Sequence, residues 1–184
     1  MTQRHLAGAR ILAQGLVGPS RFAGPTEAAR AFGAHQGQDL AGVMASLALR
    51  TGGDIEEVLA AFDRSRDGWS PNAVLVDNTL VGRIEADPFM QCAVGDARRM
   101  PGWSESLARV EPAVDDDGGA NGTRAVIRGT YEAEGKTVCV TTVYLLTEHE
   151  AGQHLAQFTV TIEAAAVDML DAVDEMVEGL RVRV

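Results

Sequence analysis

The sequence has few of the features from which secreted, membrane-spanning and metal-binding proteins are built. Only two cysteines occur among its 184 residues, and neither has another cysteine or a histidine nearby at ligand spacing. No apolar run is long enough to span a bilayer. The stretch Met1–Gly18 lacks the long apolar core of a secretion signal. We therefore expect a cytoplasmic protein without membrane contact, in which Cys92 and Cys139 are buried thiols.

Positive charge is also scarce, and it is unevenly distributed along the chain. Residues 1–66 carry a net charge of +1 and residues 67–184 a net charge of −11, which together make the −10 of the whole chain. An acidic surface repels nucleic acid and anionic membrane. Any contact with DNA is therefore expected within residues 1–66.

The first part of the chain has the residue spacing of short helices. In its last stretch, apolar residues recur at helical spacing at Ile55, Val58, Leu59 and Phe62. Asp54 with Glu57 forms a capping-box pattern at the start of this stretch. The spacing predicts three or four helices up to Arg66. Such helices are compatible with a helix-turn-helix arrangement and equally with any small helical bundle.

After Arg66 the period of the apolar residues changes from that of a helix to that of strands. Asp87-Pro88 begins a helix that Pro101-Gly102 ends, and a closing helix carries an apolar stripe from Met169 to Leu180. In the last strand Ala156, Phe158, Val160 and Ile162 alternate with polar residues. The pattern predicts an antiparallel sheet with helices packed on it. Its strands are expected at residues 73–81, 105–112, 123–133, 137–146 and 153–163, with a tight hairpin at Glu134-Gly135.

No motif for a cofactor, a metal ion or a catalytic triad is recognised. The run Asp115–Gly118 resembles the start of a calcium loop, but Ala120 and Val126 stand where that loop requires glycine and glutamate. Gly129–Thr137 has the wrong spacing for a phosphate-binding loop and is predicted to be a hairpin. The four histidines show no paired ligand spacing. We therefore predict no cofactor and no metal site.

The stretch Arg10–Arg64 resembles the opening segment of the winged-helix DNA glycosylases that unhook interstrand crosslinks (the AlkZ and YcaQ group). The resemblance is carried by Gln14-Gly15-Leu16, by Gln36-Gly37-Gln38-Asp39 and by Leu47-Ala48-Leu49-Arg50. In that family a Gln-x-Gln pair is catalytic, and by position it matches Gln36 and Gln38. This match implies a DNA-associated protein with catalytic Gln36 and Gln38.

Two features argue against glycosylase activity of this pair. The middle residue of the pair is Gly37, where the family usually has a hydrophobic residue, and glycine loosens the backbone that holds the two amides in register. A segment of net charge +1 joined to a part of −11 also lacks the positive surface that DNA binding needs. We therefore expect weak or absent base excision.

The stretch from Trp69 to Val184 resembles the LpqN and PsbP-like proteins of actinobacteria. The resemblance is carried by Pro71–Val76, by Met100-Pro101-Gly102-Trp103 and by Gly179-Leu180-Arg181-Val182 at the end of the closing helix. These families have an α/β/α sandwich and mostly adaptor or ligand-binding roles. The resemblance implies the same kind of role here. The extra strand pair that usually begins the family's domain is not recognised in this sequence.

These observations lead to one fold and two functional hypotheses. We predict an α+β protein with a helical, helix-turn-helix-like segment at residues 1–66 and an LpqN/PsbP-like domain at residues 67–184, described as an α/β/α-like sandwich. The first functional hypothesis is a non-enzymatic binding or interaction module for an unknown protein or a small hydrophobic ligand. The alternative is a DNA-associated protein derived from the glycosylases. A sheet without its first strands leaves an open edge, so we also expect a homodimer.

Overall fold

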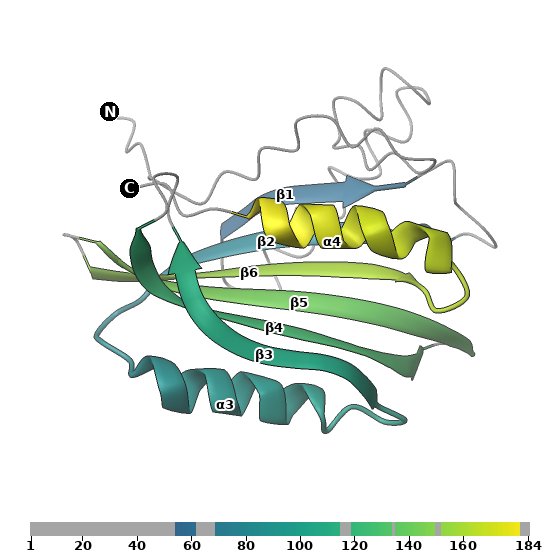
Figure 1. Cartoon of the computed structure of the whole chain (residues 1–184), viewed down its shortest axis with the longest axis horizontal. Coiled ribbons are helices and arrows are strands. Elements are labelled where there is room, and N and C mark those ends of the chain that lie inside the picture. The colour runs from purple at the N-terminus through teal and green to yellow at the C-terminus, as the bar shows by residue number, and fades with distance from the viewer. Residues whose placement is uncertain (1–53, 62–68, 115–118, 134, 150–151, 181–184) are drawn as a thin grey trace, which may run out of the picture.

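The computed structural model describes residues 54–61, 69–114, 119–133, 135–149 and 152–180, and Figure 1 shows how their elements are arranged. Strands dominate these ranges. The strands are β1 (Asp54–Ala60), β2 (Asn72–Thr79), β3 (Ser104–Val114), β4 (Ala120–Ala133), β5 (Lys136–His149) and β6 (Gly152–Glu163). The helices are α3 (Ala86–Ala97) and α4 (Leu170–Gly179), and the 3-10 turn η2 (Val167–Met169) precedes α4.

The six strands form one antiparallel sheet in the order β1-β2-β6-β5-β4-β3. Three long strands, β4, β5 and β6, follow one another along the chain and pair as neighbours. The turn between β4 and β5 is tight, with Ala133 opposite Lys136, and Gly135 in it has a φ of +77°. This confirms the hairpin expected at Glu134-Gly135, because glycine adopts that backbone conformation without steric cost.

One face of the sheet, here called the α4 face, carries the main hydrophobic core. The stripe Met169, Val173, Met176, Val177 and Leu180 is buried against it, as the sequence predicts. Opposite this stripe lie the inward residues of β6, namely Ala156, Phe158, Val160 and Ile162, all at most 6% exposed. The alternation of apolar and polar residues along β6 therefore correctly predicts which side of the strand faces the core.

The opposite face, here called the α3 face, carries a smaller core. Met90 of α3 packs against Ala125 and Leu146, and all three are buried. Nearby, the ring of Trp103 lies on Gly129, where an added Cβ would come within 2.4 Å of the indole. Glycine at position 129 therefore makes room for the tryptophan. Figure 1 shows the two helices on opposite sides of the sheet.

The sequence interpretation of Asp54–Ala60 as a helix is wrong, because this segment is strand β1. Its pairing with β2 contains an irregularity between Ile55 and Glu57. Ile55 lies opposite Val76 and Val58 lies opposite Val74. A three-residue step on β1 therefore matches a two-residue step on β2, as in a β-bulge. That extra residue imitates the i, i+3 spacing of a helix.

The predicted fold class, α+β with an N-terminal helical segment and an α/β/α-like sandwich, is also wrong. The described residues form mostly a six-stranded antiparallel sheet, and its two α-helices have only 12 and 10 residues. Strands β4 and β5 have 14 residues each, so one short helix on each face covers only part of the sheet. The helices expected before residue 54 lie outside the described residues. None of the described helices is long and apolar enough to cross a bilayer.

The two cysteines differ in environment. Cys139 is 8% exposed and belongs to the core of the α4 face, which confirms the expected buried thiol. Cys92 is exposed on α3, so the expectation that it is buried is wrong. Helix α3 instead turns Met90 and Ala93 inward.

We predict that these two thiols react with a maleimide at very different rates. Burial raises the pKa of the Cys139 thiol, and the thiolate is the reactive form. The native protein should therefore gain one label at Cys92, and Cys139 should react only in denaturant. Mass spectrometry of the labelled protein measures this, with Cys92→Ser as the control. Rapid labelling of native Cys92→Ser would contradict the buried position of Cys139.

Candidate functional site

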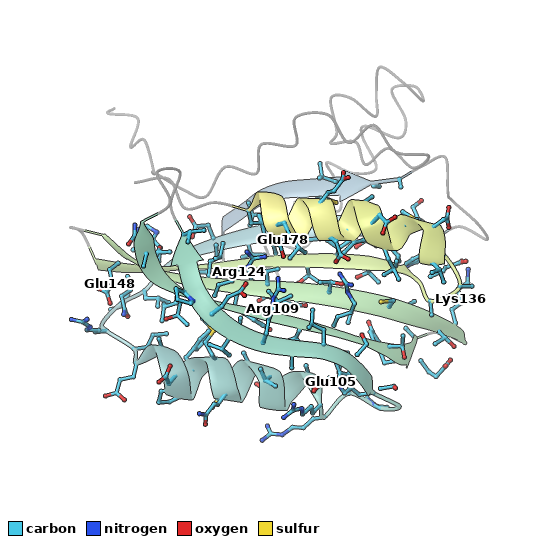
Figure 2. All side chains as sticks on the ribbon, viewed as in Figure 1. Glu105, Arg109, Arg124, Lys136, Glu148 and Glu178 are labelled. Atoms are coloured by element: carbon cyan, nitrogen blue, oxygen red, sulfur yellow. The ribbon has the colours of Figure 1, made fainter. Side chains whose placement is uncertain are left out.

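The described residues form a pocket of about 360 Å³ at the start of α3. It lies at the end of the sheet where the connection from β2 approaches α3, and Figure 2 labels Glu148 at this end. Its lining comes from three strands, the β2–α3 connection and the first turn of α3. The lining residues are Arg83, Ile84, Glu85, Ala86, Asp87, Pro88, Gly122, Thr123, Leu146, Glu148 and Gln153.

The side chain of Gln153 fixes one wall of this pocket. Gln153 lies in β6 and is only 4% exposed. Its Oε1 accepts a hydrogen bond from the backbone N–H of Ile84 at 2.7 Å, and its Nε2 donates to the Ile84 carbonyl at 3.1 Å. The Gln153 carbonyl also accepts from the Leu80 N–H at 2.9 Å. The side-chain amide of Gln153 thus makes the hydrogen bonds to the β2–α3 connection that the backbone of a neighbouring strand would otherwise make.

The floor of the pocket depends on a close approach of two strands at Gly122. Gly122 has a φ of +117°, and an added Cβ would lie 2.1 Å from the carbonyl oxygen of Leu146. Both the backbone conformation and the space therefore require glycine at this position. Thr123 and Leu146 lie opposite each other in the β4–β5 pairing, and both line the pocket.

Charges gather at the rim, and carboxylates outnumber basic groups. Glu148 accepts a hydrogen bond from Gln153 Nε2 at 2.8 Å and lies 3.2 Å from the Arg83 guanidinium. Arg83 is 80% exposed, so this ion pair contributes little stability. Glu85 and Asp87 add two further carboxylates. The rim therefore attracts positive charge, whereas Ile84, Pro88 and Leu146 provide apolar contact surface.

The polar side chains of the pocket lining are carboxylates, one arginine, one threonine and one glutamine. Within the ranges that the structure describes, no three His, Cys, Asp or Glu side chains are grouped so that they could hold a metal ion. The arrangement suits reversible binding through hydrogen bonds, charge and apolar contact.

A second charged cluster lies on the α4 face and has a structural role. Arg124, with 6% of its side chain exposed, donates to the Val177 carbonyl at 2.7 Å. Its Nε lies 3.5 Å from Glu111, and Arg109 donates to Glu178 at 2.5 Å. Figure 2 shows Arg109, Arg124 and Glu178 together between the sheet and α4. A cation at the carboxyl end of a helix is favourable, so this cluster attaches α4 to β3 and β4.

The residues that define the pocket differ from those predicted from sequence. Gln36 and Gln38 lie outside the described residues. Gln153 and Gly122 were not identified as site residues, because one glutamine and one glycine in a strand-rich sequence carry no distinctive signal. Their importance appears only when β6 is placed beside the β2–α3 connection.

Comparison with known proteins supports the second of the two resemblances. A family model described as "Probable lipoprotein LpqN" matches residues 54–183, which is more than half of the chain. The match begins at the first residue of β1. The match leaves out most of Arg10–Arg64, and the resemblance of that stretch to DNA glycosylases is not supported. A comparison with curated proteins finds no match.

Two solved structures are similar in fold. One is LpqN of Mycobacterium tuberculosis, with a TM-score of 0.53 and 15% identity, covering 67% of each chain. The other is a protein of unknown function from Pseudomonas aeruginosa, a putative regulator, with a TM-score of 0.50 and 12% identity. That match covers 69% of this chain and 81% of the other. At these identities the likeness concerns the fold alone.

The family match overturns the expected cytoplasmic location. The family is described as a probable lipoprotein, and covalent lipid attaches a protein to a membrane. Such a family points to the cell envelope. The expectation of a cytoplasmic protein is therefore wrong.

We predict that Gln153→Met destabilises the protein by about 1–3 kcal/mol, because it removes two hydrogen bonds to the partly buried N–H and C=O of Ile84. The matched control is Gln157→Met on the same strand, where the amide donates only to Thr159 and the expected cost is below about 1 kcal/mol. Urea unfolding measures both free energies, and hydrogen exchange should accelerate selectively at Ile84. Equal costs for the two substitutions would contradict the role given to Gln153.

Proposed function

The chain belongs to the LpqN family of probable lipoproteins, and we propose that it acts in the cell envelope as a non-enzymatic module that binds a small ligand in the pocket at the start of α3. The observation that carries this proposal is the construction of the pocket. Its walls are held by Gln153 and by the close approach at Gly122. A site that is already formed binds without the cost of ordering its walls.

The chemistry of the lining indicates the class of ligand. The volume of about 360 Å³ lies at the lower end of the range for small-molecule sites, roughly 300–1,000 Å³. Carboxylates of Glu85, Asp87 and Glu148 surround an apolar floor. A small amphiphilic molecule with a cationic end therefore fits best. Its charge would replace Arg83 beside Glu148, and its apolar part would contact Ile84 and Pro88.

An envelope location is supported by the family and by one relative. The LpqN protein of Mycobacterium tuberculosis is described as involved in cell envelope biogenesis. The present chain shares its fold, and we extend the location, but no specific partner, to this protein.

Ligand binding is tested with probes of matched length and different charge. Hexylamine should shift the backbone amide NMR signals of Ile84, Thr123 and Gln153, and hexanoate at the same concentration should shift them at least about tenfold less, as expected for opposite charge beside carboxylates. Glu148→Gln should weaken the amine response, whereas Glu132→Gln, at the other end of β4, should leave it unchanged. Equal responses to both probes, or shifts elsewhere in the protein, would refute this site.

The location is tested separately by fractionation of cells that make the protein. Immunoblotting should find it in the membrane or envelope fraction, with a cytosolic enzyme and a known envelope protein as markers. Recovery of the protein only with the cytosolic marker would contradict an envelope role. The two tests are independent, so a pocket that binds no amine leaves the location standing.

A further inference from the structure

Strand β3 forms one edge of the sheet, and no described strand or helix lies along its outer side. It pairs only with β4, and α3 contacts β4, one strand further in. In Figure 1, β3 lies at the front of the molecule, between the levels of α3 and α4, with no described element along its outer side. The outer N–H and C=O groups of an edge strand are a ready template for another strand.

The two ends of β3 are protected against such pairing, but its centre is not. The β3–β4 register shifts between Glu105 and Leu107, and again between Pro112 and Val114. Bulges of this kind bend an edge away from other strands. Between the two irregularities, residues 107–112 pair with β4 without a shift. A regular stretch of strand is therefore available for pairing at the middle of the edge.

The exposed side chains of this stretch are apolar on one face. Ala108, Val110 and Pro112 alternate along the α3 face, and all three are exposed. Val110 is 49% exposed and Val114 is 36% exposed, so β3 holds two of the four large hydrophobic residues that are exposed in the described ranges. Such a strip on a regular edge is a surface that another strand would cover.

We propose that a second copy of the chain pairs with this edge, β3 against β3 in antiparallel orientation, with a two-fold axis at Val110. In this register Arg109 of each copy lies opposite Glu111 of the other. Opposite charges directly across an antiparallel pair are favourable, and like charges are unfavourable. Within one chain these side chains lie 3.4 Å apart as an ion pair, and they are 39% and 34% exposed. Both can therefore also reach a neighbouring strand. Ala108 then lies opposite Pro112 on the apolar face.

The charged side chains of β3 favour this register over registers with the two-fold axis at an adjacent residue. An axis at position 109 would place Arg109 opposite Arg109, and an axis at position 111 would place Glu111 opposite Glu111. An axis at position 108 would place Glu111 opposite Glu105. Among the axes at positions 108 to 111, only the one at Val110 pairs a positive with a negative side chain. An axis at position 107 would place Arg109 opposite Glu105, but Glu105 lies beyond the register shift and outside the regular stretch. The edge is therefore self-complementary, which favours a second copy over an unrelated strand.

The first test is crosslinking at the axis. In antiparallel pairs, opposite Cα atoms lie about 4.5–5.5 Å apart, so Val110→Cys, in a Cys92→Ser background, should form a covalent dimer with a short bis-maleimide. The matched control is Val167→Cys in the same background, which is 66% exposed but lies before α4 and should stay monomeric. No dimer at position 110, or equal dimer at both positions, would overturn the proposal.

The second test uses the charges of the register. Arg109→Glu and Glu111→Arg should each weaken the dimer by at least about tenfold, because each places like charges opposite one another. An equimolar mixture of the two variants should dimerise again, because every opposing pair is then of opposite sign. Analytical ultracentrifugation over a range of concentrations measures this. Failure of the mixture to dimerise, or dimerisation of each variant as in the parent, would overturn the proposal.

Arg109 and Glu111 also contact Glu178 and Arg124 within the chain, so circular dichroism must show that both variants are folded. Val110→Lys provides a variant free of that complication, because Val110 lies on the face opposite α4. It should be monomeric and as stable as the parent. A parent protein that is monomeric at every concentration, or a Val110→Lys protein that dimerises normally, would exclude the β3 interface.

Discussion

The pairing of β2 with β6 is the constraint on which the rest of the described structure depends. These strands are far apart in the sequence but pair in continuous register from Asn72 opposite Thr161 to Thr79 opposite His154. Because β2 occupies one side of β6, the consecutive strands β5, β4 and β3 must extend the sheet on the other side. β3 is thereby left at the edge. The pairing also brings Gln153, just beyond its end, to the chain that leads into α3.

The two faces of the sheet are stabilised in different ways. The α4 face is a continuous apolar core, and the Arg124 cluster fixes the carboxyl end of α4 over it. The α3 face has a small core around Met90, and its helix begins where the Gln153 amide holds the chain. On the α3 face, hydrogen bonds therefore supply part of the stabilisation of the helix that apolar burial supplies on the α4 face. A concave site is therefore found where packing is less complete, beside the first turn of α3.

The spacing of apolar residues predicted the elements that keep a strand or helix period along their whole length. It failed where one extra residue interrupts that period. Strand β6 alternates without a break, and the α4 stripe keeps helical spacing, so both were recognised. Strand β1 was mistaken for a helix because the bulge after Ile55 adds one residue to its period. The fold class was wrong for the same reason, together with the shortness of the helices. Gln153 and Gly122 act through long-range contacts with Ile84 and Leu146, which local patterns do not reveal.

The strong negative charge of the chain limits the ways in which it can make contacts. A protein of net charge −10 repels copies of itself and other anionic surfaces wherever its acidic groups are unbalanced. Contacts are therefore favoured where carboxylates are matched by cations or where apolar groups are exposed. The β3 edge meets both conditions, since Arg109 and Glu111 alternate with exposed Val110. The pocket meets the second condition through Ile84 and Pro88. Its carboxylates, which outnumber the basic groups of the lining, attract positive charge. The same acidity thus favours a self-complementary partner at the sheet edge and a cationic ligand at the start of α3.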